Sequence, residues 1–259
     1  MSLHYRLSGA EGNPVVIFLH GFMGSSRDWT SVISKLQTDY RCLAIDLPGH
    51  GRSVACDAYS FENVLTEVLT ICEELGVDRF WLVGYSMGGR VSLYLAKQMR
   101  DRISGLVLES VSPGIENAAE RVARRDADDV LCERLEQGPF SVFLEEWYTQ
   151  PMFANLQQKP DLLKSLLRLR LDNDPSELAS ALRGMSVGRQ PDLWNVLEDL
   201  PFPVLAITGG LDTKYVGIYS RINNAKKVVI PETGHNVHLE NPASYIKAVV
   251  EFLNSHAER

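Results

Sequence analysis

The chain has 259 residues, of which 45% are hydrophobic and 23% charged, and its 33 acidic and 26 basic residues give a formal net charge of −7. These values are typical of a globular protein with a full hydrophobic core, in one large domain or two small ones. They argue against a nucleic-acid-binding surface, and no apolar run approaches the roughly 20 residues of a membrane-spanning helix.

Strand-like and helix-like segments alternate along the chain. In order, we expect strands at 3–8 and 15–19, a helix at 28–36, a strand at 41–46, a helix at 61–75, a strand at 79–84, a helix at 87–99, strands at 103–109, 203–208 and 227–230, and a helix at 243–253. Such alternation predicts an α/β fold with a mostly parallel central sheet and helices on both faces. The segment between the strands at 103–109 and 203–208 is charged, has helical periodicity and shows no convincing strand.

The sequence Gly84-Tyr85-Ser86-Met87-Gly88-Gly89 follows one expected strand and opens the next helix. G-x-S-x-G between a strand and a helix is the pattern of a nucleophile elbow, a turn too tight for side chains two residues before and after the serine. We therefore expect Ser86 to be exposed at the tip of this turn, above the N-terminus of a helix.

A serine of this kind needs a base and a group that orients the base. Asp212 and His235 each follow the carboxyl end of an expected strand, in the order serine, acid, histidine that α/β-hydrolases use. We predict that His235 accepts the proton of Ser86 and that Asp212 orients the imidazole. His238 is the alternative base, but we interpret it as structural.

A second strand end supplies the expected oxyanion hole. The strand at 15–19 runs into His20-Gly21-Phe22, and a sharp turn there would aim a backbone N–H at the site. We assign the two donors to the backbone N–H groups of Phe22 and Met87. His20 is expected to bond the loop backbone, and Asp46 and His50 in the next loop are expected to be structural.

These motifs predict an α/β-hydrolase fold, in which residues 1–111 and 198–259 form the core and residues 112–197 an inserted helical lid. The lid could gate the site or be a rigid cover. Because esterases, lipases, lyases and other enzymes share this fold, the fold alone does not select a reaction.

Arginines give more information about the substrate. Arg90 lies one helical turn after Ser86, where a guanidinium suits a carboxylated substrate because arginine binds carboxylates through two parallel hydrogen bonds. The lid contains two further groups of arginines, although charged lid residues are more often simply solvated: Arg121, Arg124 and Arg125, then Arg168 and Arg170. Trp147 and Tyr148 lie beside a turn of the lid, where they would wall a pocket or form part of its core.

Several segments together resemble one known family, the 2-succinyl-6-hydroxy-2,4-cyclohexadiene-1-carboxylate synthases of menaquinone biosynthesis. They are His20-Gly21-Phe22 with Arg27-Asp28-Trp29, Gly84-Tyr85-Ser86-Met87-Gly88-Gly89-Arg90, Trp147-Tyr148 with Gln150-Pro151, and Gly234-His235-Asn236 with His238, Glu240, Asn241 and Pro242. The resemblance runs nearly end to end, and the arginine after Gly-Gly and the Trp-Tyr-x-Gln-Pro segment are its most specific parts.

The resemblance implies a lyase that eliminates pyruvate from an enolpyruvyl cyclohexene bearing three carboxylates. Ser86, activated by His235 and Asp212, would act as a base, and charge on the succinyl oxygen would be held by the N–H groups of Phe22 and Met87. The family's substrate-binding positions fall on Arg90, Arg124, Tyr85, Trp147 and Arg170, with Arg168 as the alternative to Arg170.

The resemblance also implies an enzyme that needs no metal or organic cofactor. Its partner would be a small polycarboxylate substrate, with no nucleic acid and no membrane insertion, and the chain would be a monomer or a small homo-oligomer. The four cysteines show no C-x-x-C or metal-ligand spacing, which favours free thiols in a reducing, cytoplasmic setting.

Two other functions stay open at this stage. The expected triad alone would also serve a carboxylesterase or a C–C bond hydrolase acting on a carboxylated substrate. A non-catalytic receptor is the third possibility, although all three triad positions are filled.

Overall fold

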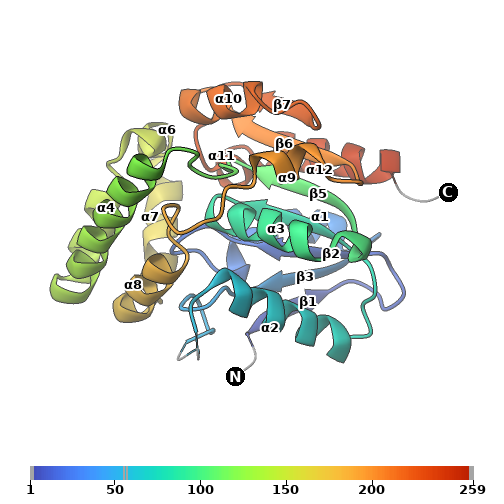
Figure 1. Cartoon of the computed structure of the whole chain (residues 1–259), viewed down its shortest axis with the longest axis horizontal. Helices are drawn as coiled ribbons and strands as arrows, with labels where there is room; N and C mark the ends of the chain where they lie inside the picture. Colours follow the sequence, from blue (N-terminus) through green and yellow to red (C-terminus); the bar gives the residue numbers. More distant parts are fainter. Residues whose placement is uncertain (1–2, 55, 57, 257–259) are drawn as a thin grey trace.

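The centre of the molecule is a seven-stranded sheet with the strand order β1-β3-β2-β4-β5-β6-β7 (Figure 1). The computed structural model describes residues 3–54, 56 and 58–256. The strands are β1 (Tyr5–Ser8), β2 (Val15–Leu19), β3 (Arg41–Ile45), β4 (Phe80–Tyr85), β5 (Ile103–Glu109), β6 (Val204–Gly209) and β7 (Lys226–Ile230). Only β1 pairs antiparallel, with β3. The expected α/β fold with a mostly parallel sheet is confirmed.

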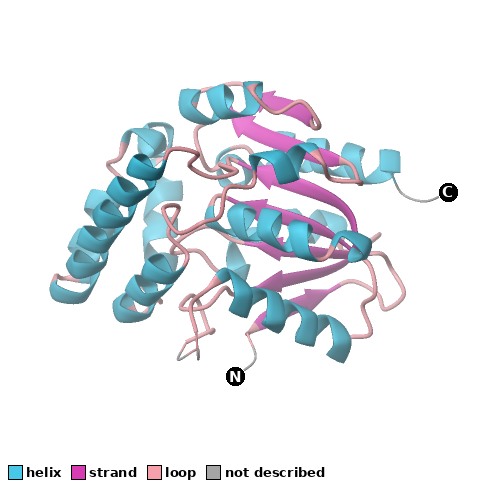
Figure 2. Ribbon diagram, viewed as in Figure 1, coloured by secondary structure: helices cyan, strands magenta, loops and turns pink. Residues whose placement is uncertain are grey.

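Helices cover both faces of the sheet and extend beyond one end of it (Figure 2). They are η1 (Ser26–Trp29), α1 (Thr30–Leu36), α2 (Phe61–Glu74), α3 (Met87–Gln98), η2 (Arg100–Arg102), α4 (Ala118–Gln137), α5 (Phe140–Trp147), η3 (Pro151–Phe153), α6 (Ala154–Gln157), α7 (Pro160–Arg170), α8 (Pro175–Gly184), α9 (Trp194–Glu198), α10 (Thr213–Ser220), α11 (Val237–Glu240) and α12 (Pro242–His256).

The strand β2 shows why the sheet is covered on both faces. All five of its residues are buried apolar side chains, as expected for a central parallel strand. Ile17 and Leu19 pack in one core cluster with side chains of α2 and α3, whereas Val16 and Phe18 pack in another with side chains of α1 and α12. Because successive side chains of a strand point to opposite faces, the two clusters lie on the two sides of the sheet.

The segment between β5 and β6 contains the helices α4 to α8, which share a third core cluster. We call residues 112–197 the helical insertion. In Figure 2 the carboxyl ends of the parallel strands point toward it. Met23, from the loop after β2, packs in the same cluster, so the insertion contacts the part of the chain that contains the sheet. The expected boundary at residue 197 falls within α9, whose Leu197 packs in the main core.

Most expected elements agree with the structure to within one or two residues, but the helix α10 and the short helices η2 and α11 were missed. The segment Thr213–Ser220 forms α10, although Val216, Gly217 and Ile218 give it weak helix propensity. Its Tyr219 is buried, and the hydroxyl donates to Leu108 O at 3.0 Å, so tertiary contacts and not local propensity stabilise this helix. The expected helix at 28–36 is divided into η1 and α1.

The described helices are all too short or too polar to span a membrane. The four cysteines, three of them buried, are free thiols.

Candidate active site

Ser86 lies between β4 and α3 with a left-handed backbone conformation, φ 49° and ψ −109°. Its own N–H donates to Glu109 O on β5 at 2.9 Å, and its carbonyl accepts from Arg90 N at 3.0 Å. A Cβ atom at Gly88 would overlap the carbonyl oxygens of Leu19 and His20, and one at Gly84 would overlap Ser92 Oγ. The tight turn therefore requires both glycines, as the sequence predicted.

The side chains of Ser86, Asp212 and His235 come together at the carboxyl ends of three different strands. His235 Nδ1 is 2.6 Å from Asp212 Oδ2, and its Nε2 is 3.2 Å from Ser86 Oγ. Because an ionised carboxylate only accepts hydrogen bonds, the ring proton lies on Nδ1 and leaves Nε2 free to accept from the serine. Asp212 and His235 are both buried, which shields this chain of hydrogen bonds from water.

The predicted oxyanion donors flank the serine. Met87 is the first residue of α3, where backbone N–H groups have no partner within the helix. Phe22 follows β2 and lines the cavity in front of Ser86. A Cβ atom at the neighbouring Gly21 would come within 3.5 Å of Ser86 Cβ, which shows how closely this turn approaches the serine.

The other histidines near the strand ends have structural partners. His20 Nδ1 donates to Gly21 O at 2.7 Å, and its Nε2 accepts from Leu47 N at 2.9 Å. Burial lowers the pKa of His20, which keeps this ring neutral. His238 pairs with the buried Glu109 at 2.8 Å and stacks on Trp29 with ring centroids 4.3 Å apart. Both histidines therefore have structural roles, as the sequence predicted.

The loop after β3 also behaves as expected. Asp46 accepts hydrogen bonds from the backbone N–H groups of Ser26 at 2.6 Å and Arg52 at 3.0 Å. His50 Nδ1 donates to Pro48 O at 2.9 Å. Burial lowers the pKa of His50 to about 3, so this ring is neutral.

The cavity in front of Ser86 is small and largely aromatic. Its volume is about 40 Å³, and its walls are Phe22, Tyr85, Ser86, Trp147, Tyr148, Met152, Phe153, Arg170, His235 and Asn236. Ligand pockets usually measure about 300–1,000 Å³. The helical insertion supplies five of these ten lining residues, so the insertion closes the site in this structure.

The predicted arginines occupy different surroundings. Of the two alternatives in α7, Arg170 lines the cavity, whereas Arg168 is exposed. Arg90 and Arg124 are not among the walls of the cavity. Arg90 is buried, and its Nη1 donates to Met185 O at 2.8 Å. Arg124 pairs with Asp128 at 2.9 Å.

Arg90 has no carboxylate partner within 4.0 Å in the described part of the chain. Burial is the main reason that its pKa falls to about 10, and the nearby Arg124 lowers the pKa further. Because an isolated buried charge is costly, the arrangement favours an anion from outside the protein.

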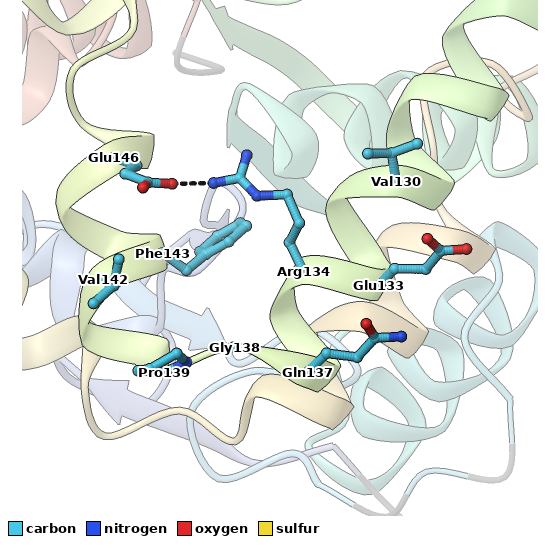
Figure 3. Close-up of a pocket in the computed structure, with 9 residues that line it drawn as sticks. All are labelled: Val130, Glu133, Arg134, Gln137, Gly138, Pro139, Val142, Phe143 and Glu146. Carbon is cyan, nitrogen blue, oxygen red and sulfur yellow. Dashed lines mark hydrogen bonds and ion pairs between the residues drawn. The ribbon is translucent and has the colours of Figure 1, made fainter.

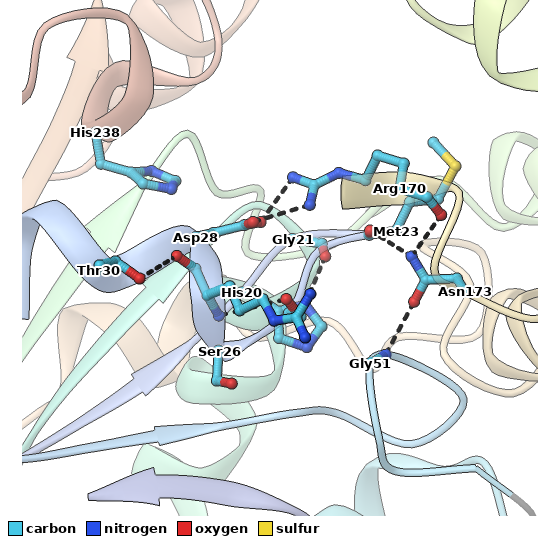
Figure 4. Close-up of polar contacts among 12 residues, drawn as sticks. His20, Gly21, Met23, Ser26, Asp28, Thr30, Gly51, Arg170, Asn173 and His238 are labelled. Atoms are coloured by element: carbon cyan, nitrogen blue, oxygen red, sulfur yellow. Dashed lines mark hydrogen bonds and ion pairs between the residues drawn. The ribbon is translucent and has the colours of Figure 1, made fainter. Parts of the chain in front are cut away.

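Arg170 is held by a buried carboxylate that sequence reasoning had not linked to it. Its Nη1 and Nη2 donate to the two oxygens of Asp28 at 2.8 and 2.7 Å (Figure 4). Its Nε donates to Tyr148 Oη at 3.2 Å. Burial opposes both charges, but the mutual attraction raises the pKa of Arg170 and lowers that of Asp28. Asn173 continues the network, accepting from Gly51 N at 2.9 Å and donating to Met23 O at 3.0 Å.

Tyr215 is a further neighbour of the site that the sequence did not indicate. It belongs to the missed helix α10, and its ring centroid is 4.8 Å from that of His235. Burial and the nearby Asp212 raise its pKa to about 12, so the phenol stays neutral. Among the described residues, no group of three or more His, Cys, Asp or Glu side chains is placed to bind a metal ion.

Known proteins resemble this chain over nearly its whole length. The family model described as alpha/beta hydrolase fold matches residues 14–242. A 2-succinyl-6-hydroxy-2,4-cyclohexadiene-1-carboxylate synthase from Salmonella agona is 38% identical over 256 residues, covering 98% of this chain and 99% of its own length. The one from Serratia proteamaculans is 35% identical over 246 residues, covering 95% of each chain.

Among solved structures, MenH from S. aureus superposes with a TM-score of 0.92 at 33% identity, covering 98% of this chain and 99% of its own.

Proposed function

The chain belongs to the α/β-hydrolase family and, within it, to the 2-succinyl-6-hydroxy-2,4-cyclohexadiene-1-carboxylate synthases, and from this we propose its reaction. It eliminates pyruvate from 2-succinyl-5-enolpyruvyl-6-hydroxy-3-cyclohexene-1-carboxylate, a lyase step of menaquinone biosynthesis. The observation that carries the proposal is Arg90, a buried cation one helical turn from Ser86 without a carboxylate partner in the described structure.

The substrate's own chemistry defines what the site must do. The ring carbon at position 2 lies between the succinyl carbonyl and the ring alkene, so its proton is the acidic one. Removal of this proton sends electrons through the alkene and breaks the C–O bond at position 5. Enolpyruvate leaves, takes up a proton and becomes pyruvate, and the ring becomes the 2,4-diene of the product.

Ser86, His235 and Asp212 form the base for this proton transfer. The serine oxygen takes the ring proton while His235 Nε2 accepts the serine's own proton, across the 3.2 Å contact between them. Asp212 stabilises the resulting imidazolium from 2.6 Å. The serine acts as a base here and forms no acyl-enzyme.

Negative charge develops on the succinyl carbonyl oxygen as the proton leaves. The backbone N–H groups of Phe22 and Met87 serve as its oxyanion hole. Fixed donors of this kind stabilise negative charge most strongly where water is excluded, as in this closed aromatic cavity. Tyr85 and Trp147, both in the cavity wall, pack against the ring.

Arginines bind the substrate carboxylates. Arg124 lies near enough to Arg90 to lower its pKa, and the pair of Arg124 with Asp128 uses only its Nε. We assign Arg90 and Arg124 to carboxylate binding. Arg170 is already paired with Asp28, so a substrate carboxylate at this position must share the guanidinium with Asp28. We propose that Arg170 mainly positions the cavity wall.

The helical insertion acts as the lid. A cavity of about 40 Å³ cannot contain a substituted cyclohexene, so substrate entry requires that α5 to α7 move away from Ser86. We therefore favour a gating lid over a rigid cover.

The test is pyruvate release from the enolpyruvyl substrate, coupled to lactate dehydrogenase. We expect stoichiometric pyruvate from the wild type, and loss of activity in Ser86→Ala and Arg90→Ala. Arg100→Ala is the matched control, because Arg100 is exposed beyond the far end of α3. No pyruvate from folded protein would overturn the proposal.

The same serine, histidine and aspartate geometry also supports the alternative, a carboxylesterase or C–C bond hydrolase acting on a carboxylated substrate. That function predicts turnover of simple aryl esters with an acyl-serine intermediate. Turnover that is unaffected by Arg90→Ala, without pyruvate release, would favour it.

A further inference from the structure

A second recess, on the helical insertion, is lined by three arginines and by no acidic residue. Its volume is about 490 Å³. Arg121 and Arg125 come from the first turns of α4, and Arg189 comes from the turn that follows α8. The Ser86 cavity shares none of its lining residues. The proposed reaction therefore uses none of these arginines.

The charges of this recess are unmatched within the described structure. Among the described residues, no ion pair is formed by Arg121, Arg125 or Arg189. Other arginines of the insertion do: Arg124 pairs with Asp128, Arg183 with Glu136, and Arg134 with Glu146 (Figure 3). Arg121 and Arg125 also lie four residues apart on one helix, where like charges destabilise the helix. An arginine cluster that is unpaired in a chain of net charge −7 favours binding of an external anion.

Close packing fixes the backbone of the recess and two of its three arginines, whereas the third, Arg189, is exposed. A Cβ atom at Gly188 would lie 2.6 Å from both Arg121 O and Arg125 Cγ, so only glycine lets this turn approach α4 so closely. The Gly188 N–H donates to Ser186 Oγ at 3.0 Å, and that hydroxyl donates to Asp128 at 2.6 Å. Arg121 and Arg125 are half-buried, which limits their freedom. Arginines fixed in this way lose little entropy when they bind a ligand.

A buried amide completes the recess. Gln190 is 1% exposed, and its Nε2 donates to Ser112 O at 3.0 Å, which fixes the orientation of the amide. Its Oε1 has no hydrogen-bond partner within the described chain. The amide therefore fixes the backbone next to Arg189 and the approach of this turn to Ser112.

We propose that Arg121, Arg125 and Arg189 form a binding site for a small, multiply charged oxyanion, either phosphate or a compact polycarboxylate. Guanidinium groups match the oxygen pairs of both classes. The three guanidinium groups supply the hydrogen bonds, because Gln190 Oε1 is buried and does not open into the recess. The volume suits a small molecule.

The position of the site gives binding a structural consequence. The two segments that join the insertion to the core run together here, with Leu193 N donating to Pro113 O at 2.8 Å and Gln190 bonded to Ser112. An anion bridging α4 and the turn at Arg189 fastens both segments where the insertion meets the core.

The test is thermal unfolding of the full chain with sodium phosphate, against sodium chloride at equal ionic strength. At a tenfold excess of phosphate over its dissociation constant, we expect a midpoint shift on the order of 3 °C beyond that in chloride. The shift should disappear in Arg121→Gln/Arg125→Gln and weaken in Arg189→Gln. Arg134→Gln, on the same helix, is the matched control that should retain it.

Two further measurements identify which anion binds and at which site. Citrate in place of phosphate distinguishes a polycarboxylate from a phosphate preference. Arg90→Gln should leave the shift unchanged, because Arg90 does not line this recess. The proposal is wrong if phosphate stabilises no more than chloride, or if the shift survives in the double variant and is lost only in Arg90→Gln.

Discussion

The buried pair Asp28–Arg170 allows a quantitative prediction. The side chains of Arg170 and Asp28 are 3% and 1% exposed, and two hydrogen bonds of 2.8 and 2.7 Å join them. Asp28→Asn keeps the shape of the side chain and removes its charge. The guanidinium of Arg170 is then left in the interior without a counter-charge.

The expected cost follows from these contacts. Charge-assisted hydrogen bonds contribute about 1.5–3 kcal/mol each, and removal of one partner of a buried pair costs roughly 3–5 kcal/mol. We therefore expect Asp28→Asn to lower the free energy of unfolding by about 3–5 kcal/mol. At roughly 2–4 °C per kcal/mol for a chain of this size, the midpoint falls by about 6–20 °C.

Urea unfolding and calorimetry measure both quantities. Arg27→Gln is the control: its pair with Asp172 has side chains 54% and 62% exposed, and such pairs contribute only about 0–1 kcal/mol. If Asp28→Asn costs no more than Arg27→Gln, the reasoning is refuted.

The same pair predicts a pH dependence. Burial opposes the charge of Asp28, but Arg170 lowers the pKa of its carboxyl in the folded state below the unfolded value of about 3.9. The pair therefore stabilises the protein above about pH 4, and this contribution is lost as the pH falls through the folded pKa. The stability difference between wild type and Asp28→Asn should narrow below about pH 4, which unfolding measured from pH 3 to pH 7 would reveal.

Three further predictions concern the Ser86 site. Ser86→Ala and His235→Ala should each lower kcat for pyruvate release by roughly 10²–10⁴-fold, and the double variant little further, because the two act as one base; additive losses would contradict this. Arg90→Ala should lower kcat/KM by roughly 30- to 5,000-fold, corresponding to about 2–5 kcal/mol, and near-normal kinetics would exclude carboxylate binding at Arg90. Gly88→Ala should lower both the unfolding midpoint and the activity, because its Cβ overlaps two carbonyl oxygens of the β2 turn; an active variant of wild-type stability would disprove the packing argument.

Sequence reasoning succeeded where local pattern decides the structure. The glycines around Ser86 and the strand ends before Asp212 and His235 are short-range features, and each was placed correctly. Parallel strands bring their carboxyl ends to one edge, so strand order did not have to be known in advance to bring these three residues together.

The remaining features depend on tertiary contacts. Asp28 and Arg170 are 142 residues apart, and nothing in either segment indicates the other. Tyr215 was missed because α10 has weak helix propensity and forms through its packing. The small volume of the cavity depends on how the insertion lies against the core, which no motif encodes.

The left-handed backbone of Ser86 ties chemical reactivity to completed folding. A non-glycine residue in such a conformation costs on the order of 1–3 kcal/mol, which the surrounding structure must offset. The supports come from other strands: Glu109 on β5 accepts the serine N–H, and the turn after β2 packs against Gly88. A nascent or partly unfolded chain lacks these supports, so its Ser86 is an ordinary alcohol. The proposed reactivity of this hydroxyl therefore depends on a sheet that is already assembled.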